Sequence, residues 1–311
     1  MSDETQVISK RASQDIDDVI DRILRDLGNP EPPLKLEDVR ELLKLDLTYY
    51  SKTDLNLLDE MSHRVRLAGQ TIINTTRRMK DVIEKVGLRA LILPGERQIF
   101  IDNEVVQLKR RFIISHEISH DIIPWHQSIL LGDNDETLSP KCYHTMEAEA
   151  NYGGRQLLFM GERFQTESRD QGAFDWKTVQ MFRKQYGNTL TTTLWQTVHS
   201  SDPASPTLGA ISRHPKHPTI GGQRAGNDNV AYFFGSPSFQ QQFSNISSEQ
   251  IYTAITSYAG FRKTGPVGEG VFTLRDRNGD AFDFNFSSFS NSYDLLTHGT
   301  MIGPHKLVIG F

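Results

Sequence analysis

Two histidines and a glutamate near the middle of the chain have the spacing of a metal-dependent hydrolytic site. His116 and His120 are four residues apart, and Glu117 directly follows the first histidine, inside an apolar run that begins at Phe112. If this run is helical, residues four apart share one face, so both imidazoles can offer a nitrogen to one zinc ion. Glu117 then lies about 100° further round the helix, where it can reach a metal-bound water without being a ligand. The spacing therefore predicts a zinc site with Glu117 as the catalytic base.

A third protein ligand is needed, because catalytic zinc sites of this kind use three side chains and leave the fourth position to water. A helix predicted over about residues 145–160 contains two candidates, Glu147 and Glu149. Glu147 shares a helical stripe with Leu157 and other apolar residues that should face the core, whereas Glu149 falls on the side expected to be more exposed. Glu147 is therefore the predicted third metal ligand and Glu149 the alternative.

These residue types predict the hydrolysis of a peptide bond. Bound zinc lowers the pKa of its water towards about 7 and polarises a carbonyl, and Glu117 can move the water's proton to the leaving amine. We expect Zn²⁺, with Mn²⁺ as the alternative, because geometry and metal supply decide between them. By proximity alone, the candidates for stabilising the oxyanion are Arg111, Tyr143, His144 and Tyr152, but for each of them a packing or surface role is favoured.

The composition bounds the class of protein. A length of 311 residues predicts two domains, and a net charge of −5 disfavours a broad nucleic-acid interface. The single cysteine, Cys142, excludes an intramolecular disulfide, and the N-terminus lacks the apolar core of a signal peptide. No apolar run approaches 18 residues, so we expect no membrane contact and a cytoplasmic location.

The N-terminal half contains the elements that must position the site. Residues 1–13 predict a flexible polar arm, and a hairpin ahead of the zinc motif offers an edge strand on which an extended peptide could pair. The zinc motif lies on a helix over about residues 105–123, which ends before Pro124. The other predicted elements are helices over 14–27, from Leu36 to Leu43 and over 71–86, and strands over 45–50, 88–93 and 98–102.

The C-terminal half begins with a predicted helical hairpin over residues 176–200. A DNA-binding helix-turn-helix is the alternative, but the second helix has no lysine or arginine for phosphates or base edges. Residues 201–228 are predicted to be a linker, with His214 and His217 on its surface.

The remaining residues predict a mixed α/β domain. Asp276 to Asp280 looks like part of a calcium loop but lacks its closing glutamate, so a β-turn is favoured. The predicted elements are a strand over 230–234, a helix over 248–258, a hairpin of 271–274 with 281–286, and a last strand over 306–311.

Two segments together resemble the ImmA/IrrE family of zinc peptidases. Members carry Arg-Phe-x-x-x-His-Glu-x-x-His and, some tens of residues later, Glu-x-x-Ala-Asn/Asp-x-Phe-Ala-x-x-Leu-Leu. The first motif corresponds to Arg111 to His120 and the second to Glu147 to Leu158, and the resemblance covers about residues 15–165. Gly153-Gly154 replaces the usual Phe-Ala, which affects the expected shape of the pocket more than the ligand set.

The resemblance implies a bacterial or phage regulator that cleaves a helix-turn-helix transcriptional repressor during stress or mobile-element induction. The expected function is thus a zinc-dependent endopeptidase with a protein substrate and no direct nucleic-acid binding. The alternative is a non-catalytic regulatory or DNA/protein-binding module with a dormant metal site. The expected α+β architecture is an arm (1–13), a helix-rich zincin-like metallopeptidase domain with a small sheet (14–165), a helix-turn-helix-like connector (166–205) and a mixed α/β, GAF-like sensory domain (206–311).

Overall fold

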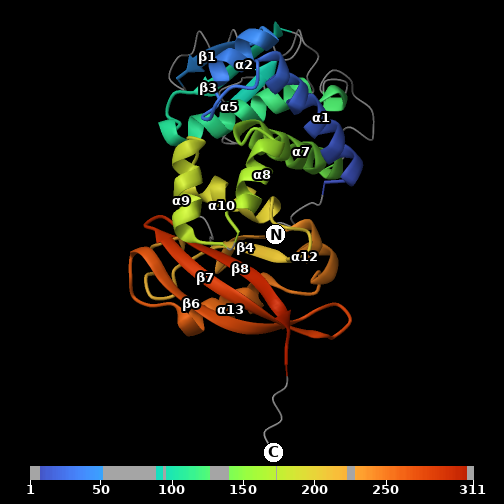
Figure 1. Ribbon diagram of the computed structural model, residues 1–311. Helices are drawn as coiled ribbons and strands as arrows, with labels where there is room; N and C mark the ends of the chain where they lie inside the picture. The colour runs from blue at the N-terminus through green and yellow to red at the C-terminus, as the bar shows by residue number, and fades with distance from the viewer. Residues whose placement is uncertain are drawn as a thin grey trace, which may run out of the picture. The chain divides into compact units, whose positions relative to one another are not determined.

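A computed structural model describes residues 8–51, 89–93, 96–126, 140–172, 174–222 and 228–306. The chain divides into two compact units, with the boundary between Gly161 and Glu162 (Figure 1). The first unit combines helices with a three-stranded mixed sheet, and the second combines helices with a five-stranded antiparallel sheet. The predicted α+β class is therefore confirmed. None of the helices in the described ranges has both the length and the apolar character needed to cross a membrane.

The sheet of the first unit has the strand order β1-β3-β2, with strands β1 (Asp46–Tyr50), β2 (Ala90–Leu93) and β3 (Gln98–Asp102). The central strand β3 pairs antiparallel with β2 and parallel with β1. Four of the five β3 residues are buried, as expected for a strand covered on both faces. The hairpin expected ahead of the zinc motif is confirmed, and β2 lies at the edge of this sheet.

Two helices of the first unit, α1 and α7, begin earlier than their apolar spacing suggests. The first helix, α1, starts at Lys10 rather than at residue 14, because the hydroxyl of Ser9 accepts a hydrogen bond from the backbone N–H of Ala12 at 3.1 Å and caps it. The helix predicted over 71–86 lies outside the described residues. The described helices of this unit are α1 (Lys10–Asp26), α2 (Leu36–Leu43), α5 (Gln107–Ile122) and α7 (Pro140–Leu158).

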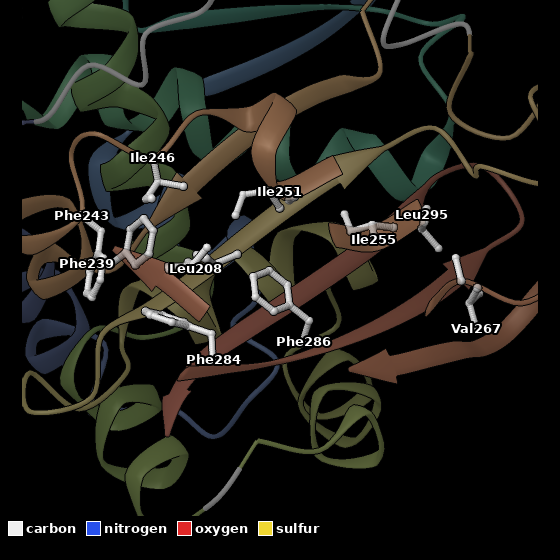
Figure 2. Packing of buried hydrophobic residues seen from close by; sticks show 13 residues of the cluster. Leu208, Phe239, Phe243, Ile246, Ile251, Ile255, Val267, Phe284, Phe286 and Leu295 are labelled. Atoms are coloured by element: carbon white, nitrogen blue, oxygen red, sulfur yellow. The ribbon is translucent and has the colours of Figure 1, made fainter. Parts of the chain in front are cut away.

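The second unit is built on a sheet of order β5-β4-β8-β7-β6 with helices on both faces (Figure 1). On one face, Phe284, Phe286 and Leu208 of the strands pack against aromatic and aliphatic side chains around α12 and α13 (Figure 2). On the other face, α9 and α10 pack against the sheet. The elements are α8 (Glu162–Asp170), α9 (Trp176–Gln185), α10 (Leu190–His199), β4 (Thr207–Ser212), β5 (Val230–Gly235), α12 (Pro237–Gln242), α13 (Ser248–Tyr258), β6 (Thr264–Arg275), β7 (Ala281–Asn291) and β8 (Leu295–Pro304).

The prediction of a linker over residues 201–228 was wrong for Thr207–Ser212, which form strand β4. All six β4 residues are buried because the strand lies in the interior of the sheet and is covered on both faces, so no polar–apolar alternation marks it. His214, predicted on a surface loop, is fully buried, and its Nε2 lies 3.0 Å from the carbonyl oxygen of Arg262. Strand β8 was not predicted.

Other expectations for the second unit are confirmed. Helices α9 and α10 flank a turn at Gly187, and Trp176, Leu194 and other residues of this hairpin lie in a buried core. The segment from Asp276 to Asp280 is a turn in which Gly279 adopts a positive φ of 91°. The last strand predicted over 306–311 is not found at Lys306, and its other residues lie outside the described ranges.

Candidate metal centre

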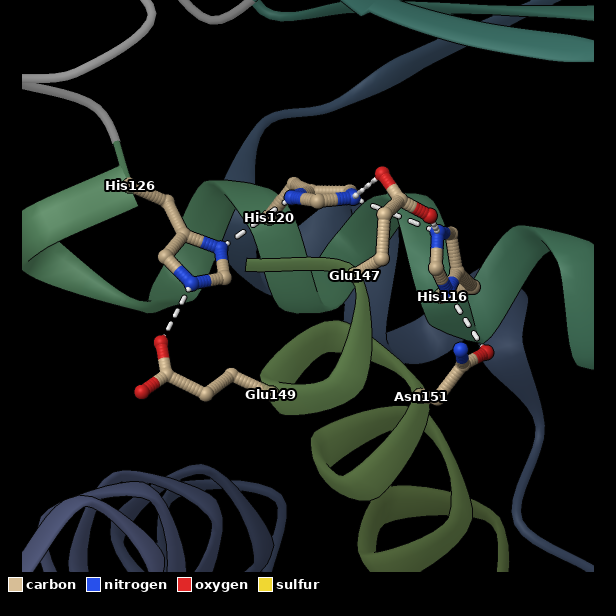
Figure 3. Close-up of polar contacts among 6 residues, drawn as sticks. All are labelled: His116, His120, His126, Glu147, Glu149 and Asn151. Atoms are coloured by element: carbon tan, nitrogen blue, oxygen red, sulfur yellow. Dashed lines mark hydrogen bonds and ion pairs between the residues drawn. The ribbon is translucent and has the colours of Figure 1, made fainter. Parts of the chain in front are cut away.

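Helices α5 and α7 bring the three predicted ligands together (Figure 3). Nε2 of His116 and Nε2 of His120 are 3.2 Å apart, and they lie 3.4 Å and 3.5 Å from the two carboxylate oxygens of Glu147. The side chain of Glu147 is 34% exposed, so the centre can be reached from solvent. Within the described ranges, this is the one group of three histidine, cysteine or acidic residues with metal-binding geometry.

The separations between these donor atoms fit a zinc ion. Donor atoms about 2.0–2.1 Å from one tetrahedral zinc lie roughly 3.3–3.4 Å from each other. Two imidazole nitrogens and one carboxylate are also a ligand set that catalytic zinc uses. The residues present therefore fit the metal that the spacing predicted.

Asn151 supports this reading, because it determines which nitrogen of His116 carries the hydrogen. The Oδ1 atom of Asn151 lies 3.1 Å from Nδ1 of His116. An amide oxygen accepts only, so Nδ1 of His116 donates and a neutral ring keeps its lone pair on Nε2. This lone pair faces His120 and Glu147, which is the arrangement that a cation would stabilise.

Burial and mutual interactions shift the pKa values of the three groups in the centre. Burial raises the pKa of Glu147, but the interactions of its carboxylate with the rings of His116 and His120 outweigh burial and hold the pKa far below the usual value. Burial lowers the pKa of His116, but the Glu147 carboxylate raises it above its usual value overall. Burial lowers the pKa of His120. Without a metal, the centre therefore attracts a proton, which metal binding would displace.

Glu117 lies beside this centre and is almost completely buried. Burial, with a smaller contribution from the Glu147 carboxylate, raises its pKa to about 7, although His116 and a hydrogen bond from the Ile92 backbone oppose the shift. Ile92 belongs to the edge strand β2, so the acid lies next to the strand on which a peptide could pair. A carboxyl group with a pKa near neutrality is suited to accept and return a proton.

Two consecutive glycines let α7 approach α5 closely at the centre. A Cβ at Gly154 would lie 3.1 Å from the backbone nitrogen of His116, and one at Gly153 would lie 3.0 Å from Oγ of Ser119. The hydroxyls of Ser115 and Ser119 bond to carbonyls of their own helix, so this face of α5 is small and internally satisfied. Close helix packing thus explains why glycine stands at both Gly153 and Gly154.

Glu149 is not a ligand in this arrangement, and its predicted exposure was wrong. It is 6% exposed, and its Oε2 accepts hydrogen bonds from Nε1 of Trp125 at 2.7 Å and Nε2 of His126 at 2.9 Å. Nδ1 of His126 in turn lies 3.1 Å from Nδ1 of His120. His126 was not predicted to belong to the site, although a third histidine six residues after His120 is visible in the sequence.

Two of the four candidates for stabilising the oxyanion have hydrogen-bond partners outside the metal centre, in keeping with the favoured packing role. Nη1 of Arg111 donates to the carbonyl of Leu34, and the hydroxyl of Tyr152 donates to Asp17 of α1. His144 is exposed. The side chains of Cys142 and Tyr143 lie outside the described part of the structure.

Comparisons with known proteins place the fold but not the chemistry. No protein-family model and no curated protein sequence matches the chain. A solved structure described as a Mycobacterium tuberculosis transcriptional regulator is similar over 97% of this chain and 94% of that chain, with a TM-score of 0.51 and 12% sequence identity. At this identity the likeness shows a shared fold alone, so this chain has the fold of that regulator together with a His116–His120–Glu147 group able to bind a metal.

Proposed function

We propose that the chain is a zinc-dependent endopeptidase of the ImmA/IrrE type that cleaves a transcriptional repressor. The observation that carries the proposal is the convergence of His116, His120 and Glu147, with the buried acid Glu117 beside them. The motifs that resemble the family and the likeness to the fold of a transcriptional regulator support it.

Each residue of the centre has a distinct task in this function. His116, His120 and Glu147 would hold the ion, which when bound polarises the scissile carbonyl and acidifies a water. Glu117 accepts the proton of the attacking water and donates it to the leaving amine, a role that its pKa of about 7 favours. The edge strand β2 provides backbone groups for pairing with an extended substrate, beside Glu117.

The second candidate is a regulatory module whose metal site does not catalyse. The fold likeness to a transcriptional regulator is the observation that favours it. Direct DNA binding through α10 is disfavoured, because this helix is rich in threonine, lacks lysine and arginine, and buries Leu194 and Val198 against the sheet.

Incubation with a candidate substrate separates the two functions. The purified chain, loaded with one equivalent of Zn²⁺, is mixed with helix-turn-helix repressors from the same genome, beginning with any that is encoded beside it, and new termini are mapped by mass spectrometry. The proposal expects one defined cut by the wild type, and none by His120→Ala, which loses the metal, or by Glu117→Gln, which keeps it. Metal binding by the wild type without any cut in these repressors or in an unfolded protein substrate would favour the regulatory module.

A further inference from the structure

A chain of hydrogen bonds runs from Glu149 on α7 to the buried back of His120 (Figure 3). Its middle member, His126, is completely buried. Helix α5 ends before Pro124, and the backbone N–H of His126 bonds to the carbonyl of Ile123. This turn places the His126 ring against the His120 ring on α5.

The hydrogens in this chain can be assigned from the carboxylate outwards. An indole nitrogen only donates, so Oε2 of Glu149 accepts a hydrogen bond from Nε1 of Trp125 at 2.7 Å. The same carboxylate oxygen lies 2.9 Å from Nε2 of His126. Nε2 of His126 therefore donates to it, and a neutral ring keeps its lone pair on Nδ1. Nδ1 of His120 must then carry the hydrogen that this lone pair accepts. Nε2 of His120 consequently faces His116 and Glu147 without a hydrogen.

We infer that Glu149 and His126 are positioning residues that hold His120 in the one tautomer and orientation able to ligate a metal. The inference rests on the proposed metal site and extends it from three ligands to the groups behind them. His116 obtains the same tautomer from Asn151, so each histidine has its own hydrogen-bond acceptor on α7, one direct and one through a second imidazole. Trp125 donates to the same carboxylate oxygen as His126 and so helps to keep it in place.

The tautomers can be observed directly in the metal-free full-length protein. Long-range ¹H–¹⁵N spectra of protein labelled at histidine distinguish a hydrogen on Nδ1 from one on Nε2. We expect His120 with its hydrogen on Nδ1 and His126 with its hydrogen on Nε2, and in Glu149→Ala we expect His120 as a mixture of both forms. A hydrogen on Nε2 of His120 in the wild type would overturn the inference, whether or not the protein is a peptidase.

Zinc affinity supplies a second readout that does not depend on catalysis. Groups behind a ligand typically change metal affinity about 10- to 100-fold when removed, and we expect a loss of this size for Glu149→Ala and for His126→Phe. The double variant should lose no more than either single one, because both interrupt the same chain of hydrogen bonds. Glu149→Gln should stay within about 3-fold of wild type, because its amide oxygen can accept from both His126 and Trp125.

Gln156→Ala is the matched control for a structural effect of these substitutions. Gln156 is buried on the same helix and bonds to Asp17, away from the metal centre. We expect Gln156→Ala to bind zinc with wild-type affinity even though its thermal stability falls by as much as that of Glu149→Ala, or by more. Equal affinity losses in Gln156→Ala and Glu149→Ala would refute the positioning role and leave the metal site intact. A wild type that binds no zinc would instead refute the proposed function.

Discussion

Glu117 is the residue on which catalysis depends most directly, because it is near the ligands but is not one of them. It is 7% exposed and interacts with both His116 and Glu147. Glu117→Gln keeps the shape of the side chain and removes its ability to take a proton. We expect zinc affinity within a few-fold of wild type and turnover reduced by roughly 10²- to 10⁴-fold, the range for loss of a general base. Zinc titration and single-turnover cleavage of the mapped substrate measure the two quantities, and full turnover by the variant would assign the base elsewhere.

His298 gives the second unit a dependence on pH that can be predicted with its sign. The ring is buried and stacks on Phe174 with centroids 3.4 Å apart, and burial lowers its pKa to about 3. The folded state therefore keeps the ring neutral, while the unfolded chain takes up a proton below about pH 6.5. Stability that is present above pH 6.5 is lost as the pH falls towards 3, at roughly 1.4 kcal/mol per pH unit.

The variant His298→Gln tests this pH dependence, because it has no ring to protonate in the unfolded state. At pH 7 we expect the variant to be less stable than wild type, since the stacking on Phe174 is lost. The difference should shrink by roughly 1 kcal/mol or more between pH 6.5 and pH 5. Urea unfolding at each pH measures it, and parallel curves for the two proteins over this range would show that His298 does not contribute.

At the same scale, the sequence was most informative where chemistry is local. The pair His116 and His120 could be identified because four residues on a helix determine their relation without any tertiary knowledge. Helical phase selected Glu147, but it wrongly placed Glu149 on an exposed side. The burial of Glu149 was not foreseen because its hydrogen-bond partner is His126. His126 comes after the end of α5 and a turn at Pro124, so helical periodicity does not predict its position.

At the scale of elements, the distance between α5 and α7 is set by residues that carry no functional group. Gly154 faces the backbone of His116, which cannot move aside as the end of a flexible side chain could. Alanine normally favours a helix over glycine by about 1 kcal/mol, but here its Cβ would lie 3.1 Å from the His116 nitrogen. A substitution at this position therefore tests whether helix spacing controls the metal centre.

We expect Gly154→Ala to weaken zinc binding by moving Glu147 away from the histidines, with a loss of about 10-fold or more. Gly153→Ala is the control, because its Cβ would meet the side chains of Ser119 and Ile16 rather than the backbone of a ligand. Isothermal titration with zinc measures both variants, and circular dichroism verifies that both are folded. Unchanged affinity in Gly154→Ala would mean that α5 accommodates the methyl group.

Elements with a clear periodicity could be predicted, and those defined by their neighbours could not. The hairpin of β2 and β3 and helix α13 follow turn residues and apolar spacing that act over a few residues. Strand β4 escaped prediction because Thr207 to Ser212 is buried on both faces and contains small residues. Its identity as a strand depends on β5 and β8, which pair with it from 18 or more residues away along the chain.

At the scale of the whole molecule, each unit has its own sheet and the metal centre belongs to only one of them. The three ligands and the groups behind them all lie before Gly161, whereas His298 and both cores of the five-stranded sheet lie after Glu162. Zinc should therefore stabilise the first unit, and acid should destabilise the second through His298. Zinc binding and a fall in pH should therefore change the stability of different units of the chain.

Differential scanning calorimetry of the full chain can resolve this division. A ligand that binds only the folded state stabilises it by about 2.7 kcal/mol at a free concentration 100 times its dissociation constant. For a unit of this size, that corresponds to a rise of roughly 5–10 °C in its transition temperature. We expect zinc to move one transition by this amount in the wild type and not in His120→Ala, while His298→Gln moves the other. A single transition that zinc raises and His298→Gln lowers would show that the two units unfold as one, because a change in the stability of either unit would then be shared by the whole chain.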